Sequence, residues 1–315
     1  MPNDAFKQMA NTDNFRIFYN QSIQPELVRL DKQRRQLLRR MFFTLLLWAG
    51  IAVLLFYLQV FVFALYALIP FGIYLYVMTA RFRKFVLTFK PRVVKLILDF
   101  IDDGLLFGDL KYNPKGKIEL KKFLWSSLFG ARPAVYEGED YIEGRIGDVE
   151  FELCELRVQE FSRVRARLDD VFRGVFIRSK FFAPLKGAML VLPKKELPQL
   201  SEAVRDFVRN GGQAMDGFVR HEEFRKVYTI YGSRHTKVAD LLPDELMDFM
   251  LQYRKKKGEV YLSLFGKNCY VALSSKKDIL EPKLFQSNIS YELVREFYED
   301  IDAALFMVMA LDRSH

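Results

Sequence analysis

Residues that carry most catalytic chemistry are scarce in this sequence. Its 315 residues include 2 Cys and 3 His, and they contain no P-loop, GxGxxG, HExxH, GxSxG or CxxC motif. Two cysteines are too few for a disulfide framework, which excludes a disulfide-stapled secreted scaffold. The 17 Gly and 11 Pro exclude a collagen-like or low-complexity chain. The sequence therefore names no catalytic residue and no cofactor, and its length predicts one or two globular units.

Charge is absent from residues 41–79, and Gln59 is the one strongly polar side chain near the middle of this run. A single helix of that length would be about twice as long as the hydrocarbon layer is thick. Two helical spans, 41–57 and 61–79, fit better and would turn at Leu58-Gln59-Val60. A buried core helix is excluded, because such helices seldom run uncharged beyond about 18 residues.

Basic residues flank this predicted hairpin on one side. Residues 29–40 hold six basic residues and one acid, and residues 81–95 hold six basic residues and no acid. The positive-inside bias then predicts a multi-pass protein of a bacterial inner membrane with both termini in the cytoplasm. The predicted membrane-interface residues are Arg34, Arg35, Arg39, Arg40, Arg81, Arg83 and Lys84.

These two basic strips have a general and a specific use. The general use is attraction to the anionic headgroups of a lipid bilayer, worth about 1 kcal/mol per side chain. The specific use is recognition of one phosphoinositide-like or cardiolipin headgroup. We favour the general use, because the topology alone requires the charges. Nucleic acid is not an expected partner, since the net charge of +9 lies in these strips and not on the folded part.

One other topology stays open. A single tilted span followed by an interfacial helix would place the long C-terminal body outside the cytoplasm. A cleavable signal peptide is not expected, because the apolar run begins at residue 41 and is much longer than a signal-peptide core.

Four parts are predicted along the chain. Residues 1–40 form a cytosolic amphipathic arm and residues 41–79 the transmembrane hairpin. Residues 80–130 form a juxtamembrane helical segment, with a helix opening at Pro91. Residues 131–315 form a cytosolic domain of mixed helices and strands.

Period-2 alternation marks the strands of this domain. Val149, Phe151 and Leu153 alternate, and the apolar positions resume at Leu156 with shifted parity, which predicts a bulge near Cys154-Glu155. The other predicted strands are 141–146, 171–177, 188–192, 227–231 and a hairpin at 260–273, and the predicted helices are 243–257 and 290–311. The fold class is α+β, with an antiparallel sheet and a C-terminal helix. Seven strand-like segments and a closing helix are similar to a pleckstrin-homology-like barrel.

Few side chains suggest metal or redox chemistry. Cys154 and Cys269 fall in predicted strands, and we interpret them as small buried hydrophobic residues. His221 precedes two glutamates, but neighbouring residues do not share one face of a helix or strand. A metal site would need His235, Glu139 or Asp140 as further ligands. No metal site is assigned.

Several segments together resemble a bacterial membrane-protein family, the domain of unknown function 3137. They are an aromatic arm leading to PELVRLDKQR, the uncharged double span, YEGEDYIEGRIGDVEFELCELRVQ, VFRGVFI, KGAMLVLP, HEEFRKVYTIYGSRHTKVADLLPDELMDFM and VYLSLFGKNCYVAL. The resemblance implies no reaction, cofactor or catalytic residue. It implies a LemA-like membrane protein as a partner. The chain departs from the family pattern at Ser233-Arg234-His235, so no role of those family residues is transferred.

Two function classes follow. The first is a non-catalytic binding or scaffolding module at the cytoplasmic face of the membrane, with the hairpin 260–273 and the helix 290–311 as candidate contact elements and a homo-oligomer among its expected assemblies. The second is a membrane-tethered hydrolase or metal-dependent enzyme that uses His221, His235 and nearby carboxylates. A transporter is less favoured than either, because two spans without an intramembrane charge offer no ion path.

Overall fold

The computed structural model describes residues 12–59, 61–102, 107–130, 132–162, 165–196, 201–275 and 285–313. The chain divides into two compact units. Unit 1 comprises Met1–Phe100 and Leu280–Glu296, and unit 2 comprises Ile101–Ile279 and Phe297–His315. The four parts expected from the sequence stay a prediction.

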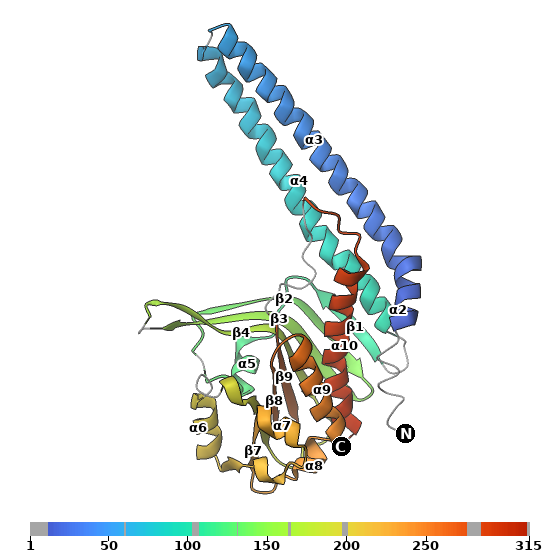
Figure 1. Cartoon of the computed structure of the whole chain (residues 1–315), viewed down its shortest axis with the longest axis vertical. Coiled ribbons are helices and arrows are strands. Elements are labelled where there is room, and N and C mark those ends of the chain that lie inside the picture. The colour runs from blue at the N-terminus through green and yellow to red at the C-terminus, as the bar shows by residue number, and fades with distance from the viewer. Residues whose placement is uncertain are drawn as a thin grey trace. The chain divides into compact units, whose positions relative to one another are not determined.

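Unit 1 is built on two long helices (Figure 1). The chain enters through α2 (Thr12–Phe18) and a π-helical turn, η1 (Tyr19–Ile23), and continues as α3 (Gln24–Tyr57). Pro25 lies at the start of α3, where its missing N–H costs nothing. After Leu58 and Gln59 the chain resumes as α4 (Phe61–Ile101). The left-handed φ of 54° at Gln59 ends the first helix, so the predicted turn is confirmed at these two residues. Val60 lies outside the described residues.

The helix predicted to open at Pro91 is a continuation of α4. Pro70 and Pro91 both lie inside this 41-residue helix. A proline removes one backbone donor, but it does not start a new helix where burial holds the backbone on both sides. Phe89, Val93 and Ile97 are fully buried around Pro91.

Only part of the predicted hairpin has the properties of a membrane span among the described residues. There, one helical stretch, Asn14–Tyr57, is long and apolar enough to cross a membrane by length and composition, with a mean hydropathy of 1.9 in its most apolar window. None of that window is buried. The structure thus supports one apolar span near the N-terminus.

Aromatic rings hold the N-terminal arm within unit 1. Phe15 is fully buried and meets the Phe100 ring edge-on at 5.4 Å between centroids. Tyr19 contacts Tyr291 in the same manner at 5.1 Å. The arm that the sequence predicted as amphipathic therefore buries its aromatic side.

The described residues of unit 2 form one antiparallel sheet of nine strands (Figure 1), in the order β1-β2-β3-β4-β9-β8-β5-β7-β6. The strands are β1 (Phe107–Asn113), β2 (Val135–Ile146), β3 (Val149–Ser162), β4 (Arg167–Lys180), β5 (Met189–Pro193), β6 (Gly212–Ala214), β7 (Tyr228–Ser233), β8 (Val260–Phe265) and β9 (Asn268–Ser274). The helices are α5 (Leu120–Trp125), α6 (Ser201–Arg209), α7 (Glu222–Val227), α8 (Val238–Leu241), α9 (Asp244–Lys256) and α10 (Tyr291–Arg313), whose first turns belong to unit 1.

Aromatic side chains fill the core on one face of the sheet. Phe123 of α5 stacks on Phe129 at 5.4 Å and contacts Phe176 of β4 at 5.2 Å. Cys154 and Leu156 of β3 are fully buried in the same cluster. The central strands are covered on both faces, since every residue of Val260–Leu264 is buried. This double burial explains their almost continuous apolar sequence.

The predicted strands and helices of this domain are largely confirmed, but their arrangement differs from the expectation. The sheet is open and nine-stranded, in place of a pleckstrin-homology-like barrel of seven strands. The hairpin 260–273 forms β8 and β9 in the middle of the sheet, and the stripe of helix 290–311 is buried. Neither element offers the free contact surface that we expected, because both supply the core.

The parity shift at Cys154-Glu155 has its counterpart on the paired strand. Glu139 faces Glu155 and Ile142 faces Leu153, so β2 has one residue more than β3 in this interval. Asp140 takes a left-handed φ of 56° there. The bulge lies opposite Cys154, in β2.

Gly174 allows the closest backbone approach in the sheet and gives the first prediction. Its φ is +145°, and a Cβ there would lie 2.1 Å from the Leu273 carbonyl oxygen on β9. We expect Gly174→Val to lower the free energy of unfolding by about 3 kcal/mol, from strain and from the clash. Gly108→Ala is the control, because a Cβ at Gly108 has nothing within 4 Å. Chemical unfolding of the detergent-solubilised chain measures both, and equal stabilities would contradict the register.

Candidate functional site

The two long helices of unit 1 pair in a constant register. Arg92 of α4 donates to Glu26 of α3 at 3.1 Å. Farther along, the hydroxyls of Thr44 and Tyr74 lie 2.8 Å apart. The Trp48 and Phe71 rings then meet at 5.2 Å. Contacts spread over this length fix the distance between the helices.

Asp31 forms ion pairs with two of the predicted interface arginines. Its side chain is 2% exposed and lies 2.8 Å from Arg34 and 2.7 Å from Arg35. The Arg34 side chain is itself only 6% exposed. Arg34 therefore serves the interior of unit 1, and its charge is not free to attract lipid.

Three others of the predicted set, Arg39, Arg40 and Arg81, line one pocket. It has a volume of about 560 Å³ and is completed by Gln36, Phe43, Thr44 and Tyr74. We call it the interfacial pocket. Among the described residues, its three arginines form no ion pair. Arg83 and Lys84 are exposed and do not line it. The structure thus divides the seven predicted basic residues into two arginines that pair with Asp31, three that line the pocket and two exposed residues outside it.

The predicted metal ligands do not form one site. Glu139 and Asp140 come together with Glu155, and their carboxylate oxygens lie within 4.8 Å of one another. Tyr112 donates to Asp140 at 2.6 Å. This group includes neither histidine. Glu155 joins this carboxylate group because β3 pairs with β2 across the bulge. The shifted parity of the apolar residues in β3 was the sequence signal for this bulge.

The two histidines have local roles. His221 caps α7, since its Nδ1 accepts from the Phe224 N–H at 3.2 Å. Its Nε2 lies 2.9 Å from Asp248. His235 is exposed in the turn after β7. The histidine next to two glutamates thus caps the N-terminus of a helix.

Both cysteines are free and buried, as we predicted. Burial raises the pKa of the Cys154 thiol to about 12, and burial raises that of Cys269 to about 12 as well. The Cys154 sulfur accepts from the Ile118 N–H at 3.3 Å. Both thiols are therefore protonated at neutral pH and poor nucleophiles.

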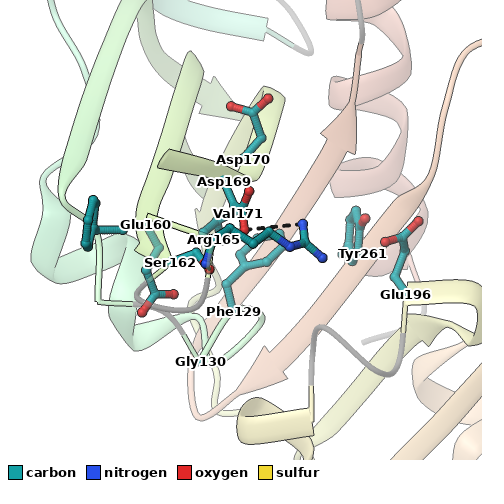
Figure 2. Close-up of a pocket in the computed structure, with 11 residues that line it drawn as sticks. Phe129, Gly130, Glu160, Ser162, Arg165, Asp169, Asp170, Val171, Glu196 and Tyr261 are labelled. Atoms are coloured by element: carbon teal, nitrogen blue, oxygen red, sulfur yellow. Dashed lines mark hydrogen bonds and ion pairs between the residues drawn. The ribbon is translucent and has the colours of Figure 1, made fainter. Parts of the chain in front are cut away.

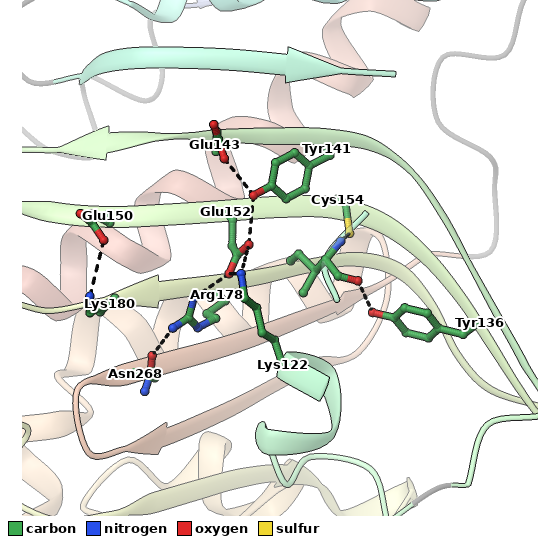
Figure 3. Close-up of polar contacts among 11 residues, drawn as sticks. Lys122, Tyr136, Tyr141, Glu143, Glu150, Glu152, Cys154, Arg178, Lys180 and Asn268 are labelled. Atoms are coloured by element: carbon green, nitrogen blue, oxygen red, sulfur yellow. Dashed lines mark hydrogen bonds and ion pairs between the residues drawn. The ribbon is translucent and has the colours of Figure 1, made fainter. Parts of the chain in front are cut away.

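A buried ion-pair network that the sequence did not reveal lies in unit 2 (Figure 3). Glu152 of β3 accepts from Arg178 at 2.7 Å and from Lys122 at 2.9 Å. Arg178 lies directly opposite Glu152 on β4 and also donates to Asn268 at 2.9 Å. The Tyr141 hydroxyl lies 3.1 Å from Glu152. The network joins α5 to four strands, β2, β3, β4 and β9.

The charges in this network control the pKa of Glu152. Burial alone would raise that pKa, but hydrogen bonds from Arg178 and Lys122 outweigh burial and hold it below the ordinary value. Burial and the negative charge of Glu152 raise the pKa of the Tyr141 hydroxyl. Glu152 is therefore an ionised structural carboxylate, unsuited to act as a general acid.

Unit 2 has a pocket with a volume of about 490 Å³ (Figure 2). Its apolar part is formed by Phe129 and Tyr261, whose ring centroids lie 5.2 Å apart. Its charged lining is mostly acidic and consists of Glu160, Asp169, Asp170, Glu196 and Arg165. Asp169 is paired with Arg165 at 3.4 Å, and Figure 2 shows the Arg165 side chain pointing toward Tyr261. This acidic aromatic pocket suits a cationic group better than an anion.

The sequence analysis missed this pocket. Burial and the charge of Glu196 raise the pKa of the Tyr261 hydroxyl, so Tyr261 stays neutral. Its lining comes from β3, β4, β8 and the segments beside α5 and β5. Residues so far apart in the sequence share no motif, and only the strand order brings them together.

Comparison with known proteins agrees with the resemblance seen in the sequence. Residues 170–313 match the family model described as protein of unknown function (DUF3137), and this part of the chain is a domain of that family. No curated protein matched the chain. The crystal structure of the mycobacterial trehalose monomycolate transport factor A, TtfA, is similar over 63% of this chain and 88% of its own, at 9% identity. With a TM-score of 0.28, that likeness supports no conclusion about this chain.

The Glu152 network gives the second prediction. A carboxylate whose pKa is lowered by folding stabilises the fold above its unfolded pKa of about 4.5, and this contribution disappears as the pH falls through the folded pKa. At pH 7 we expect Glu152→Gln to lower the free energy of unfolding by about 3 kcal/mol, because Arg178 and Lys122 lose their partner. Between pH 7 and pH 3 the variant should lose less stability than the wild type.

The control is Glu150→Gln, since the Glu150 side chain is 59% exposed and lies 3.8 Å from Lys180. Such an exposed pair contributes about 0.5 kcal/mol or less. Chemical unfolding at a series of pH values tests both variants. Identical pH profiles for wild type and Glu152→Gln would disprove the role assigned to this carboxylate.

The cysteines give the third prediction. Because burial protects both thiols and keeps them protonated, an aromatic disulfide reagent at pH 8 should titrate neither in the folded chain and both in denaturant. A thiol that reacts in the folded chain as fast as free cysteine would contradict the burial.

Proposed function

We propose that this protein is a bacterial inner-membrane-anchored binding or scaffolding module, displayed at the cytoplasmic face and without catalytic activity of its own. The observation that carries the proposal is the exposed apolar surface of α3. Phe42, Leu47 and Val53 are between 61% and 68% exposed, and no described residue of unit 1 buries them. A surface of this kind needs a partner or a lipid phase.

The proposal includes a second span in the first half of α4. Residues 61–79 carry no charge, and Ile69, Ile73 and Tyr76 are more than 60% exposed. The turn after α3 returns the chain antiparallel to it, and both basic strips then lie at the same end of the hairpin. The positive-inside bias places that end in the cytoplasm.

The acidic aromatic pocket is the part of unit 2 that we assign to binding. Glu160 and Glu196 line it without an ion pair among the described residues. A partner that presents a basic side chain would find an aromatic wall and free carboxylates together. A LemA-like membrane protein or a second copy of this chain remains our proposal for the partner.

The enzymatic alternative has less support. His221 is engaged with α7 and Asp248, and both thiols are buried and protonated. The group of Glu139, Asp140 and Glu155 offers oxygen ligands alone, which suit a structural calcium or magnesium ion better than the zinc of a hydrolase.

The fourth prediction concerns topology. A reporter that is active only in the periplasm should be active when inserted at Gln59 and silent when fused after His315. A single tilted span with an interfacial helix would give the reverse result for the C-terminal fusion, and activity there would overturn the proposal.

The fifth prediction concerns binding. Affinity purification from gently solubilised membranes should recover a stoichiometric partner, or a second copy of the chain. Glu160→Gln with Glu196→Gln should weaken that recovery about tenfold. Glu222→Gln with Glu223→Gln removes the same charge from exposed positions of α7 and should not. Recovery of no stoichiometric partner, including the chain itself, would contradict the proposed function.

A further inference from the structure

We propose that the interfacial pocket between α3 and α4 binds the phosphate headgroup of an anionic phospholipid. This inference rests on the proposed insertion of the hairpin into the membrane. It goes beyond general attraction, because it assigns the binding to particular arginines and not to the number of basic residues.

The first argument is charge. Arg39, Arg40 and Arg81 converge on the pocket from two helices. No carboxylate lines the pocket, whereas Arg34 and Arg35 on the cytosolic side share ion pairs with Asp31. Three guanidinium groups without a counter-ion among the described residues form a local excess of positive charge. Guanidinium groups bind phosphate oxygens through paired N–H donors.

The second argument is the change in polarity along the pocket. Gln36 and Arg39 lie on the cytosolic side of α3, and Phe43 lies within the apolar run that begins at residue 41. The Thr44 and Tyr74 hydroxyls both lie near the Arg40 carbonyl oxygen, at 2.8 and 3.3 Å. A ligand that is anionic at one end and apolar at the other matches this sequence of groups. A free anion would use only half of it.

The third argument is preorganisation. The pocket lies between the Glu26–Arg92 contact and the Trp48–Phe71 contact, so side chains join the two helices on both sides of it. The Thr44–Tyr74 contact belongs to the pocket wall itself. A ligand therefore enters a formed pocket, and little ordering of the helices opposes binding. Its volume of about 560 Å³ is within the range of small-molecule sites.

Lipid retention tests the inference. The full chain is purified in mild detergent from membranes, and bound phospholipids are counted by native mass spectrometry. We expect the wild type to retain an anionic phospholipid. Arg39→Gln with Arg81→Gln should reduce this retention at least about tenfold, because two phosphate-binding forks are lost. Arg83→Gln with Lys84→Gln removes the same charge from exposed positions outside the pocket and should cost much less.

Three further outcomes decide between sources and causes. Equal losses in both double variants would overturn the inference in favour of general attraction. Displacement of the lipid by inorganic phosphate or glycerol phosphate at millimolar concentration would overturn the lipid assignment and indicate a soluble phosphate ligand. The wild type should retain bound lipid when it is reconstituted in nanodiscs that contain an anionic phospholipid. It should not do so in nanodiscs of phosphatidylcholine alone, and this difference would support the lipid assignment.

Carbonate extraction of the same membranes separates the inference from the proposed function. A chain that resists carbonate but retains no anionic phospholipid disproves the headgroup site and leaves the membrane anchor standing. A chain that carbonate releases disproves the anchor and the headgroup site together.

Discussion

An apolar surface of α3 that the described residues of unit 1 leave exposed is the constraint on which the rest of this unit depends. Phe42, Leu47 and Phe56 of α3 lie outward. In water such a surface would favour aggregation, and in lipid it is stable because every backbone group of a helix is bonded internally. The contacts between α3 and α4 are arranged in agreement with this apolar surface. Glu26–Arg92 and the Asp31 pairs lie on the basic side, whereas Trp48 and Phe71 meet within the apolar run.

Much of the fold could be predicted from local patterns. The uncharged run 41–79 contained its own turn, and the alternation of Val260, Leu262 and Leu264 with Cys269 and Val271 located a hairpin whose register the structure confirms. Strand order could not be predicted. The same alternation fits an edge or a central strand, so the hairpin that we expected at a binding surface lies in the middle of the sheet. Helix continuity through Pro91 was also hidden, because burial on both sides outweighs one missing hydrogen bond.

The polar sites were harder to predict than the fold, for a physical reason. Glu152 appears in the sequence as the outward residue between Phe151 and Leu153, and only pairing with Arg178 across the sheet makes it a buried ion. The sequence located the basic strips by charge, and their role at a membrane interface stays a prediction. The sequence did not show which arginines form ion pairs, because Asp31 reaches Arg34 and Arg35 one helical turn away.

The length of α4 has a mechanical consequence. Its 41 residues correspond to a rod of about 60 Å, roughly twice the thickness of a hydrocarbon layer. In the topology that we propose, the first half of α4 would be immersed in the bilayer and the second half would project from it as part of the same rod. Any change in bilayer thickness that alters the inclination of the immersed half swings the projecting half through the same angle. Such a lever would make the position of Ile101 sensitive to the physical state of the surrounding lipid.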